Sequence, residues 1–173
     1  MINKDLVIFD EWVDPEGKKW SFEYHNSDDF LGLPYDRCKQ CYGVCFYNEK
    51  MVIGYGGNKK SWGLIGGTIE KGETFIETLT REVEEESNMR VISAMPIGYQ
   101  KVPNAYGEGD FYQLRFMAVV EPIGEFVSDP AGGITEIKLI DPKEYKSYFD
   151  WGTIGDEIIR RANELYLQSK INL

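Results

Sequence analysis

The chain has 173 residues, 42% of them hydrophobic and 28% charged, so we expect a folded protein of one domain, or of one domain with an added arm. The formal net charge of −10 excludes polymeric nucleic acid as an expected partner, and a small phosphorylated substrate would need a cation between itself and the protein. Apolar stretches such as residues 116–120 fall far short of the roughly 20 residues that cross a bilayer. Because acids follow the short apolar run at the start and a basic leader is missing, we expect a cytoplasmic protein with no membrane partner.

Residues 1–37 are predicted to form a β-hairpin and a connector. Strands are expected at residues 6–13 and 18–24, and the turn between them has proline second and glycine fourth, which is typical of a type I turn. Residues 26–37 carry turn formers and a proline, and they lead into the main domain. With Trp12 and Trp20, the hairpin is a candidate for homodimer contact or for extension of a sheet, and the alternative is that it covers the protomer's own core.

Residues 38–173 are expected to form the main domain. Strands are predicted at residues 42–48, 51–55, 90–100, 111–121 and 136–140. Helices are predicted at residues 75–87 and 151–170, with loops at residues 56–60, 101–110 and 125–134. The first helix has well-marked ends, because Thr74 and Glu77 are spaced as a capping box and Asn88 tolerates the left-handed conformation that ends a helix.

This first helix also carries the residues that indicate chemistry. Glu82, Glu85 and Glu86 are spaced i, i+3 and i+4, so their carboxylates share one side of the helix. An apolar stripe lies about a quarter-turn away and is expected to anchor the helix on a sheet; it consists of Ile76, Leu79 and Val83. Like charges at these intervals each cost roughly 0.2 to 0.5 kcal/mol, which a cation would offset.

Oxygen ligands favour a hard cation, and Mg²⁺ is bound by one or two carboxylates together with waters and substrate phosphates. We therefore expect a Mg²⁺ site for a diphosphate, with Mn²⁺ as the alternative ion. The competing interpretation is that the acidic run is only a solvated helix face in an acidic protein. Gly66 and Gly67, which let backbone approach a ligand, and the fixed spacing of Glu73 and Arg81 to the acids favour the metal site.

The segment GTIEKGETFIETLTREVEEESNM, residues 67–89, resembles the Nudix box, the signature of the Nudix (MutT-type) hydrolases. Eight of the nine positions that define the box are present, and the ninth is Asn88 in place of glycine. The resemblance implies an α+β fold, the α/β/α sandwich with a mixed β-sheet, from about residue 38 to the end, preceded by the hairpin. It also implies a Mg²⁺-dependent pyrophosphohydrolase. The substrate would be a nucleoside diphosphate linked to another group: a nucleoside triphosphate, oxidised or not, ADP-ribose, or another sugar nucleotide.

The resemblance also assigns roles to the residues of the box. It implies that Glu82, Glu85 and Glu86 bind the metal or act as general base, and that the carbonyl of Gly66 is a further ligand. It implies that Glu73 and Arg81 tie the loop to the helix. Some relatives take the base from a later loop, for which Asp129 and Glu136 are the candidates; a surface or turn role is the alternative for each.

Two positions depart from the family pattern. Asparagine tolerates the left-handed backbone better than other residues with a side chain, so Asn88 should preserve function. Ile65 stands where many relatives have proline, which weakens the assignment of the Gly66 carbonyl.

Candidates for substrate binding lie outside the box. Lys59, Lys60 and Trp62 precede the catalytic loop and could meet a phosphate and a base, and Tyr106, Phe111 and Arg115 could line a cleft. Solvated lysines and packed aromatic residues are the alternatives. A binding module with the Nudix fold that senses a nucleotide without cleaving it is the second function considered.

Three cysteines allow a second metal hypothesis. Cys38 and Cys41 have the spacing of zinc ligands, and Cys45 with His25, the single histidine, could complete a tetrahedral site. The alternative is that the cysteines pack in the core around the first strand of the main domain. The lack of a second ligand pair favours packing.

Overall fold

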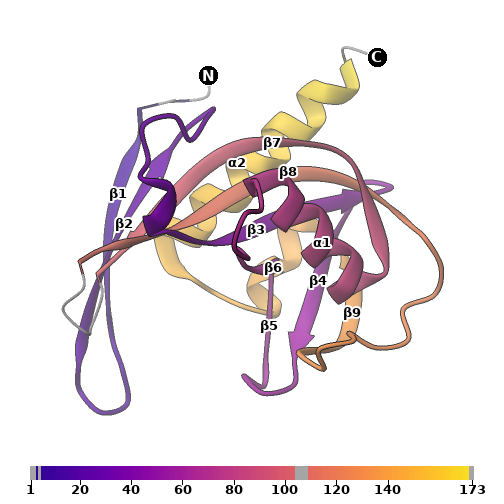
Figure 1. Ribbon diagram of the computed structural model, residues 1–173, viewed down its shortest axis with the longest axis horizontal. Helices are drawn as coiled ribbons and strands as arrows, with labels where there is room; N and C mark the ends of the chain where they lie inside the picture. Colours follow the sequence, from indigo (N-terminus) through magenta and orange to yellow (C-terminus); the bar gives the residue numbers. More distant parts are fainter. Residues whose placement is uncertain (1–2, 4, 104–108, 172–173) are drawn as a thin grey trace.

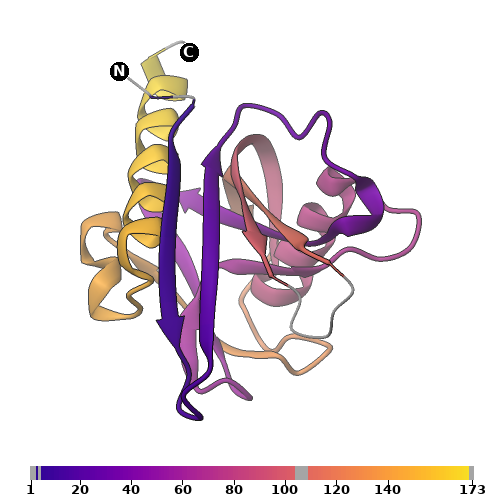
Figure 2. The ribbon, with the colours of Figure 1, turned by 90° about the vertical axis from the view of Figure 1, so that its left-hand side faces the viewer.

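The computed structural model describes residues 3, 5–103 and 109–171, which form a sheet with a helix on each face (Figure 1). The strands are β1 (Val7–Val13), β2 (Lys19–Asn26), β3 (Cys38–Tyr47), β4 (Lys50–Gly56), β5 (Ser61–Gly63), β6 (Ile65–Thr68), β7 (Met89–Val102), β8 (Phe111–Pro122) and β9 (Ile134–Ile140). The helices are α1 (Phe75–Ser87) and α2 (Gly152–Ile171), with short 3₁₀ helices η1 (Tyr35–Arg37) and η2 (Pro142–Ser147). Figure 2 shows α2 on one side of the sheet and α1 on the other.

The sheet is mixed. Its strands follow the order β1-β2-β7-β8-β3-β4-β5, with β6 paired to β3 and β9 paired to β4. The β3–β8 pair is parallel, and the other pairs are antiparallel. The prediction of an α+β sandwich with a mixed sheet is therefore confirmed.

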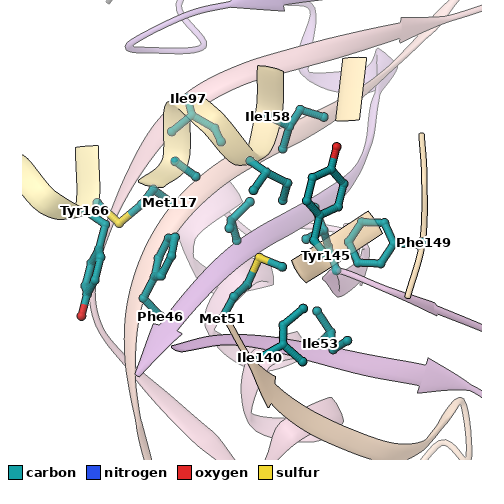
Figure 3. Close-up of a cluster of buried hydrophobic side chains, with 14 of the residues drawn as sticks. Phe46, Met51, Ile53, Ile97, Met117, Ile140, Tyr145, Phe149, Ile158 and Tyr166 are labelled. Carbon is teal, nitrogen blue, oxygen red and sulfur yellow. The ribbon is translucent and has the colours of Figure 1, made fainter. Parts of the chain in front are cut away.

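Each face of the sheet has its own core, because alternate side chains of a strand point to opposite faces. On β3, Val44 and Phe46 pack beneath α2, and Cys45 between them packs beneath α1. Figure 3 shows the α2 side, where Phe46 stacks on Tyr166 with ring centroids 4.3 Å apart. The α1 side is closed by Leu79 and Val83 and by strand residues such as Leu114.

The N-terminal hairpin is an extension of this sheet. Its second strand, β2, pairs with β7, and Tyr24 faces Gln100 in the register. The turn forms as expected, with the Gly17 N–H donating to the Asp14 carbonyl at 2.9 Å. Of the roles considered for the hairpin, the structure therefore shows sheet extension, and it also shows that the hairpin covers the protomer's own core, since Tyr24 is buried there and Ile8 and Phe22 pack against it. The division into units at residues 37 and 38 and the homodimer stay predictions.

Most predicted elements are present, and the differences have physical reasons. The strands β5 and β6 were not predicted, because each has only three or four residues and contains glycine. The assignment of Ile76 to the buried stripe of α1 is wrong, since its side chain is 46% exposed. It lies in the first turn, where Phe75 takes the packing position by stacking on Tyr35 and meeting Phe30 edge to face. In the described part of the chain, neither helix has the length and apolar character to span a membrane.

Candidate active site

The site is built on two consecutive glycines in β6, Gly66 and Gly67, which we call the glycine turn. Gly66 has a φ of +148°, and a Cβ there would lie 2.1 Å from the carbonyl oxygen of Cys41 on β3. Only glycine allows the two strands to approach this closely. The turn is thereby held against β3, and the Gly66 N–H donates to the carboxylate of Glu86 at 2.8 Å.

The next glycine receives a second carboxylate. A Cβ on Gly67 would lie 2.5 Å from Oε1 of Glu82, so this carboxylate lies directly over the Gly67 backbone. Helix α1 supplies both acids one turn apart, and Leu79 and Val83, both fully buried, fix the helix on the sheet. The spacing of 82 and 86 therefore places two acids on two consecutive glycines.

Arg81 connects the loop, the turn and the helix. Its Nε donates to Glu73 at 2.6 Å, and its Nη2 donates to Glu73 at 3.0 Å and to the Thr68 carbonyl at 2.9 Å. Its Nη1 donates to Glu82 at 2.9 Å and to Glu85 at 3.3 Å. The guanidinium lowers the pKa of Glu73 to about 2, mainly through these hydrogen bonds.

The two acids on the glycine turn titrate differently from Glu73. Burial raises the pKa of Glu86 to about 8, and the charge of Glu82 adds to the shift. Burial also raises the pKa of Glu82, against the hydrogen bond from Arg81. Burial therefore disfavours the charged form of both carboxylates, and a cation beside them would favour it.

The donor set fits a hard divalent cation. Glu82 and Glu86 offer carboxylate oxygens at one backbone turn, which are the ligands that Mg²⁺ prefers. Glu85 is 41% exposed and is turned toward Arg81. Within residues 3, 5–103 and 109–171, no three acidic, histidine or cysteine side chains are already gathered as a metal shell. Of the three glutamates, Glu82 and Glu86 therefore lie at the glycine turn, and Glu85 does not.

The ends of α1 are fixed as the sequence indicates. The Thr74 hydroxyl accepts from the Glu77 N–H at 3.2 Å, and the Glu77 carboxylate accepts from the Thr74 N–H at 2.7 Å. Asn88 adopts a φ of +53°, and its side-chain amide donates to the Glu125 carbonyl at 2.8 Å. Asparagine therefore supplies the left-handed helix end and also anchors the loop that follows β8.

A cavity of about 840 Å³ opens beside the glycine turn. Glu86 and Gly66 line it at the turn, and Tyr42 and Arg115 line it on the adjacent strands β3 and β8. Trp12 and Phe22 of the hairpin also contribute to its lining. Glu86 thus faces a space large enough for a nucleotide-sized ligand, whereas Glu82 is not among the lining residues.

A family model described as the NUDIX domain matches residues 41–162, which is more than half of the chain. The chain belongs to the Nudix family. The prediction of a Nudix hydrolase, the class that acts on phosphorus anhydrides, is thereby confirmed at the level of the family. No curated protein matches the chain.

Solved structures share the Nudix fold at low identity. A pyrophosphohydrolase from Bacillus subtilis has a TM-score of 0.59 at 21% identity, and the match covers 76% of this chain and 77% of that one. The NUDIX domain of NrtR from Shewanella oneidensis, complexed with ADP ribose, has a TM-score of 0.58 at 15% identity, with 78% and 94% covered. A UDP-X diphosphatase has a TM-score of 0.53 at 15% identity, with 79% and 68% covered.

Some of the residues predicted to bind substrate in this Nudix chain line the cavity, and others do not. Lys59, Trp62 and Arg115 line it, and the charge of Lys59 acts on Glu86. Lys60 and Phe111 are not among its lining residues. Tyr106 lies outside the described residues.

The two alternative bases have different surroundings. Asp129 is buried, and its carboxylate accepts the N–H groups of Ala131, Gly133 and Ile134 at 2.8 to 3.0 Å. It therefore shapes its loop, and its charge also contributes to the raised pKa of Glu82 and Glu86. Glu136 is exposed on β9, 3.8 Å from the Lys138 amine.

The cysteines pack in the core beneath α1. Cys38, Cys41 and Cys45 are free and buried in β3, and burial raises the pKa of Cys41 to about 12. His25 lies on β2, where it stacks on Tyr99 with ring centroids 4.8 Å apart. In the part of the chain that the structure describes, these residues do not form the zinc site considered from the sequence.

Sequence reasoning missed the hairpin and strand residues that line the cavity. Trp12, Phe22, Gln100 and Gln113 all line it, although they lie on β1, β2, β7 and β8. No local motif marks them, because only the pairing of these strands brings them to one place. The single sequence signal was the aromatic content of the hairpin.

Proposed function

We propose that this Nudix family member is a Mg²⁺-dependent pyrophosphohydrolase, with Mn²⁺ as the alternative ion. The observation that carries the proposal is the seating of Glu82 and Glu86 on two consecutive glycines, of which Gly66, with Glu86, lines the cavity. This arrangement supports a divalent cation, which these carboxylates would hold and which would offset the repulsion between a diphosphate and a protein of net charge −10.

In the proposed mechanism, water attacks one phosphorus of the diphosphate and the bridging phosphorus–oxygen bond breaks. By resemblance to the family, Glu82, Glu85, Glu86 and the Gly66 carbonyl would hold the metal, and one of the three glutamates would accept the proton of the attacking water. The metal, when bound, neutralises phosphate charge and lowers the pKa of that water. Arg81 holds Glu82 and Glu85 in position from the loop side, with Glu73 fixing the guanidinium.

We propose a small-molecule substrate of the class nucleoside diphosphate linked to another group. The relatives support this class, since one was solved with ADP ribose and another is named a UDP-X diphosphatase. A nucleoside monophosphate and a phosphorylated fragment would be the products. Location in the cytoplasm and the absence of a polymeric nucleic acid partner stay predictions.

The test is product analysis over a panel of nucleotides with Mg²⁺. The panel contains nucleoside triphosphates, including oxidised ones, ADP-ribose and UDP-sugars. Glu86→Gln preserves the acceptor for the Gly66 N–H but removes the charge, and it should lower kcat/KM by about 1,000-fold or more. Glu84→Gln on the exposed side of the same helix is the matched control and should retain activity within about twofold.

Two results would contradict the proposal. Unchanged turnover in Glu86→Gln would remove the glutamate from the chemistry. Tight binding of a nucleotide by the wild-type protein without any turnover would favour the sensing module instead.

A further inference from the structure

Arg115 is a buried cation that pairs with no carboxylate in the part of the chain that the structure describes. It lies on β8 with 4% exposure, and its Nη2 donates to Gln113 at 3.1 Å and to Gln100 at 3.5 Å. Its Nη1 donates to the carbonyl of Leu114 at 3.3 Å, while its buried Nε has no hydrogen-bond partner among the described residues. No ion pair joins Arg115 to a described acid, and the described groups that accept its hydrogen bonds are all neutral.

The other buried arginine of this molecule shows the contrast. Arg161 on α2 is fully buried, and its Nη2 pairs with Asp28 at 2.6 Å, although its Nε and Nη1 lack partners among the described residues. An unpaired buried charge is costly for a fold. Burial accordingly lowers the pKa of Arg115. The fold therefore balances the charge of Arg161 and leaves that of Arg115 unbalanced.

Arg115 lies at the same register position of the sheet as Gly66, two strands away. In the register of the sheet, Gly66 of β6 faces Tyr42 of β3, and Tyr42 faces Arg115 of β8. Two strand spacings separate Gly66 from Arg115, which is about 10 Å. The guanidinium lies 4.9 Å from the ring centroid of Tyr42, and all three residues line the same cavity.

The charges around the cavity favour an anion at Arg115. Glu86 lies at the glycine turn, and the hairpin end of the cavity carries Asp10, Glu11 and Asp150. The described lining has two cations, the exposed Lys59 near Glu86 and the buried Arg115. A negatively charged group entering from the glycine turn therefore meets its counter-charge at Arg115 before it reaches the acids of the hairpin end.

We propose that Arg115 is a specificity-determining residue that binds a second anionic group of the substrate, beyond the phosphates held at the glutamates. The inference rests on the proposed function and narrows its substrate class. Favoured substrates carry a further phosphate, as nucleoside triphosphates do, and nucleoside diphosphates linked to an uncharged sugar are disfavoured. Gln100 and Gln113 orient the guanidinium by accepting from Nη2.

An anion explains the site better than the edge of a base. Arginine can also donate to the O6 and N7 atoms of guanine. A neutral base would satisfy the free N–H group but would leave the buried charge uncompensated, whereas a phosphate supplies both acceptors and charge.

The test measures binding of inorganic triphosphate and inorganic pyrophosphate by calorimetry with Mg²⁺ present. Arg115→Met should weaken triphosphate binding by about tenfold or more and leave pyrophosphate binding within about twofold. Because the charge has no partner to lose, the variant should melt no lower than the wild type. Arg161→Met is the matched control: it removes the ion pair with Asp28, so it should melt several degrees lower and bind triphosphate as the wild type does.

Triphosphate binding that is unchanged in Arg115→Met would overturn the proposal. A melting temperature that falls as far as that of Arg161→Met would also overturn it, because Arg115 would then be structural. A preference for GTP over ATP that depends on Arg115, with unchanged binding of inorganic triphosphate, would overturn the proposal and show that Arg115 binds a guanine base instead of an anion. The binding assay does not require turnover, so a protein that binds triphosphate through Arg115 but hydrolyses no nucleotide would refute only the proposed function.

Discussion

The two sides of the glycine turn are built in different ways. On the α1 side, Arg81 makes bonds to Glu73, Glu82, Glu85 and the Thr68 carbonyl, all within 18 residues of sequence. On the cavity side, Arg115 donates only to neutral groups among the described residues, and its Nε has no partner among them. The contacts of Arg81 are thus assembled from local sequence and pair its charge with carboxylates, whereas the surroundings of Arg115 are assembled from distant strands and include no described carboxylate.

The glycine turn lies between these two regions. Substitution of its first glycine, Gly66, should destabilise the fold more than the other substitutions considered below. In Gly66→Ala, the new Cβ would lie 2.1 Å from the Cys41 carbonyl and 2.6 Å from the Tyr42 Cα, and neither backbone atom can move without breaking the β3–β6 pairing. We expect the free energy of unfolding to fall by roughly 4 kcal/mol, measured by urea denaturation. Gly72→Ala, with positive φ but open space, is the control and should cost about 1 kcal/mol. Equal unfolding midpoints for Gly66→Ala and the wild type would contradict the close approach.

The second glycine should affect activity more than folding. In Gly67→Ala, the Cβ would meet the carboxylate of Glu82, which is the mobile end of a side chain and can move away. We expect kcat/KM for the best nucleotide of the panel to fall by about 100-fold, with a loss of stability below about 1 kcal/mol. A variant that hydrolyses nucleotides at the wild-type rate would show that the position of Glu82 over Gly67 is irrelevant to the reaction.

The ion pair that closes the α1 side should contribute pH-dependent stability. Because Arg81 lowers the pKa of Glu73 to about 2, the contribution is fully present above the unfolded value near 4.5 and is lost as the pH falls through about 2. Glu73→Gln should lower the free energy of unfolding by roughly 1 to 2 kcal/mol at pH 7, and the difference from the wild type should shrink below pH 4.5. Denaturation at several pH values measures this, and a difference that grows on acidification would have the wrong sign.

The smallest expected effect concerns the end of α1. Asn88 has a φ of +53°, so Asn88→Gly should be close to neutral in thermal unfolding, despite loss of the bond to the Glu125 carbonyl. Asn88→Ala should cost about 1 kcal/mol, because alanine resists the left-handed conformation. Equal stability of the two variants would refute the conformational explanation for this departure from the Nudix box.

The α1 side could be predicted from sequence because its contacts are local. The helix Phe75–Ser87, its capping box and its end at Asn88 follow from residues only a few positions apart. The same local reasoning placed Ile76 in the core by its angle around the helix, and it was wrong because the first turn is covered at Phe75 instead. The position of a residue around the helix axis does not show how far along the helix the covering sheet and loops extend.

The cavity side could not be predicted beyond a few candidates. Lys59 and Trp62 were named because they precede the catalytic loop, and Arg115 because it lies on the strand after the loop at residues 101–110. Nothing in the sequence indicated that Gln100 and Trp12 line the same cavity. Their place depends on β2 pairing with β7 and β7 pairing with β8, contacts that no periodicity specifies. The short strands β5 and β6 were missed for the same reason, since they are held by β4 and β3.

The most direct test of the central claim is a titration of Mn²⁺ followed by electron paramagnetic resonance. The protein variants are the wild type, Glu82→Gln with Glu86→Gln, and the control Glu84→Gln. If the two acids on the glycine turn hold the catalytic cation, the double variant should bind Mn²⁺ at least about tenfold more weakly than the wild type, and the control should match the wild type. Equal Mn²⁺ affinity in all three proteins would contradict the account.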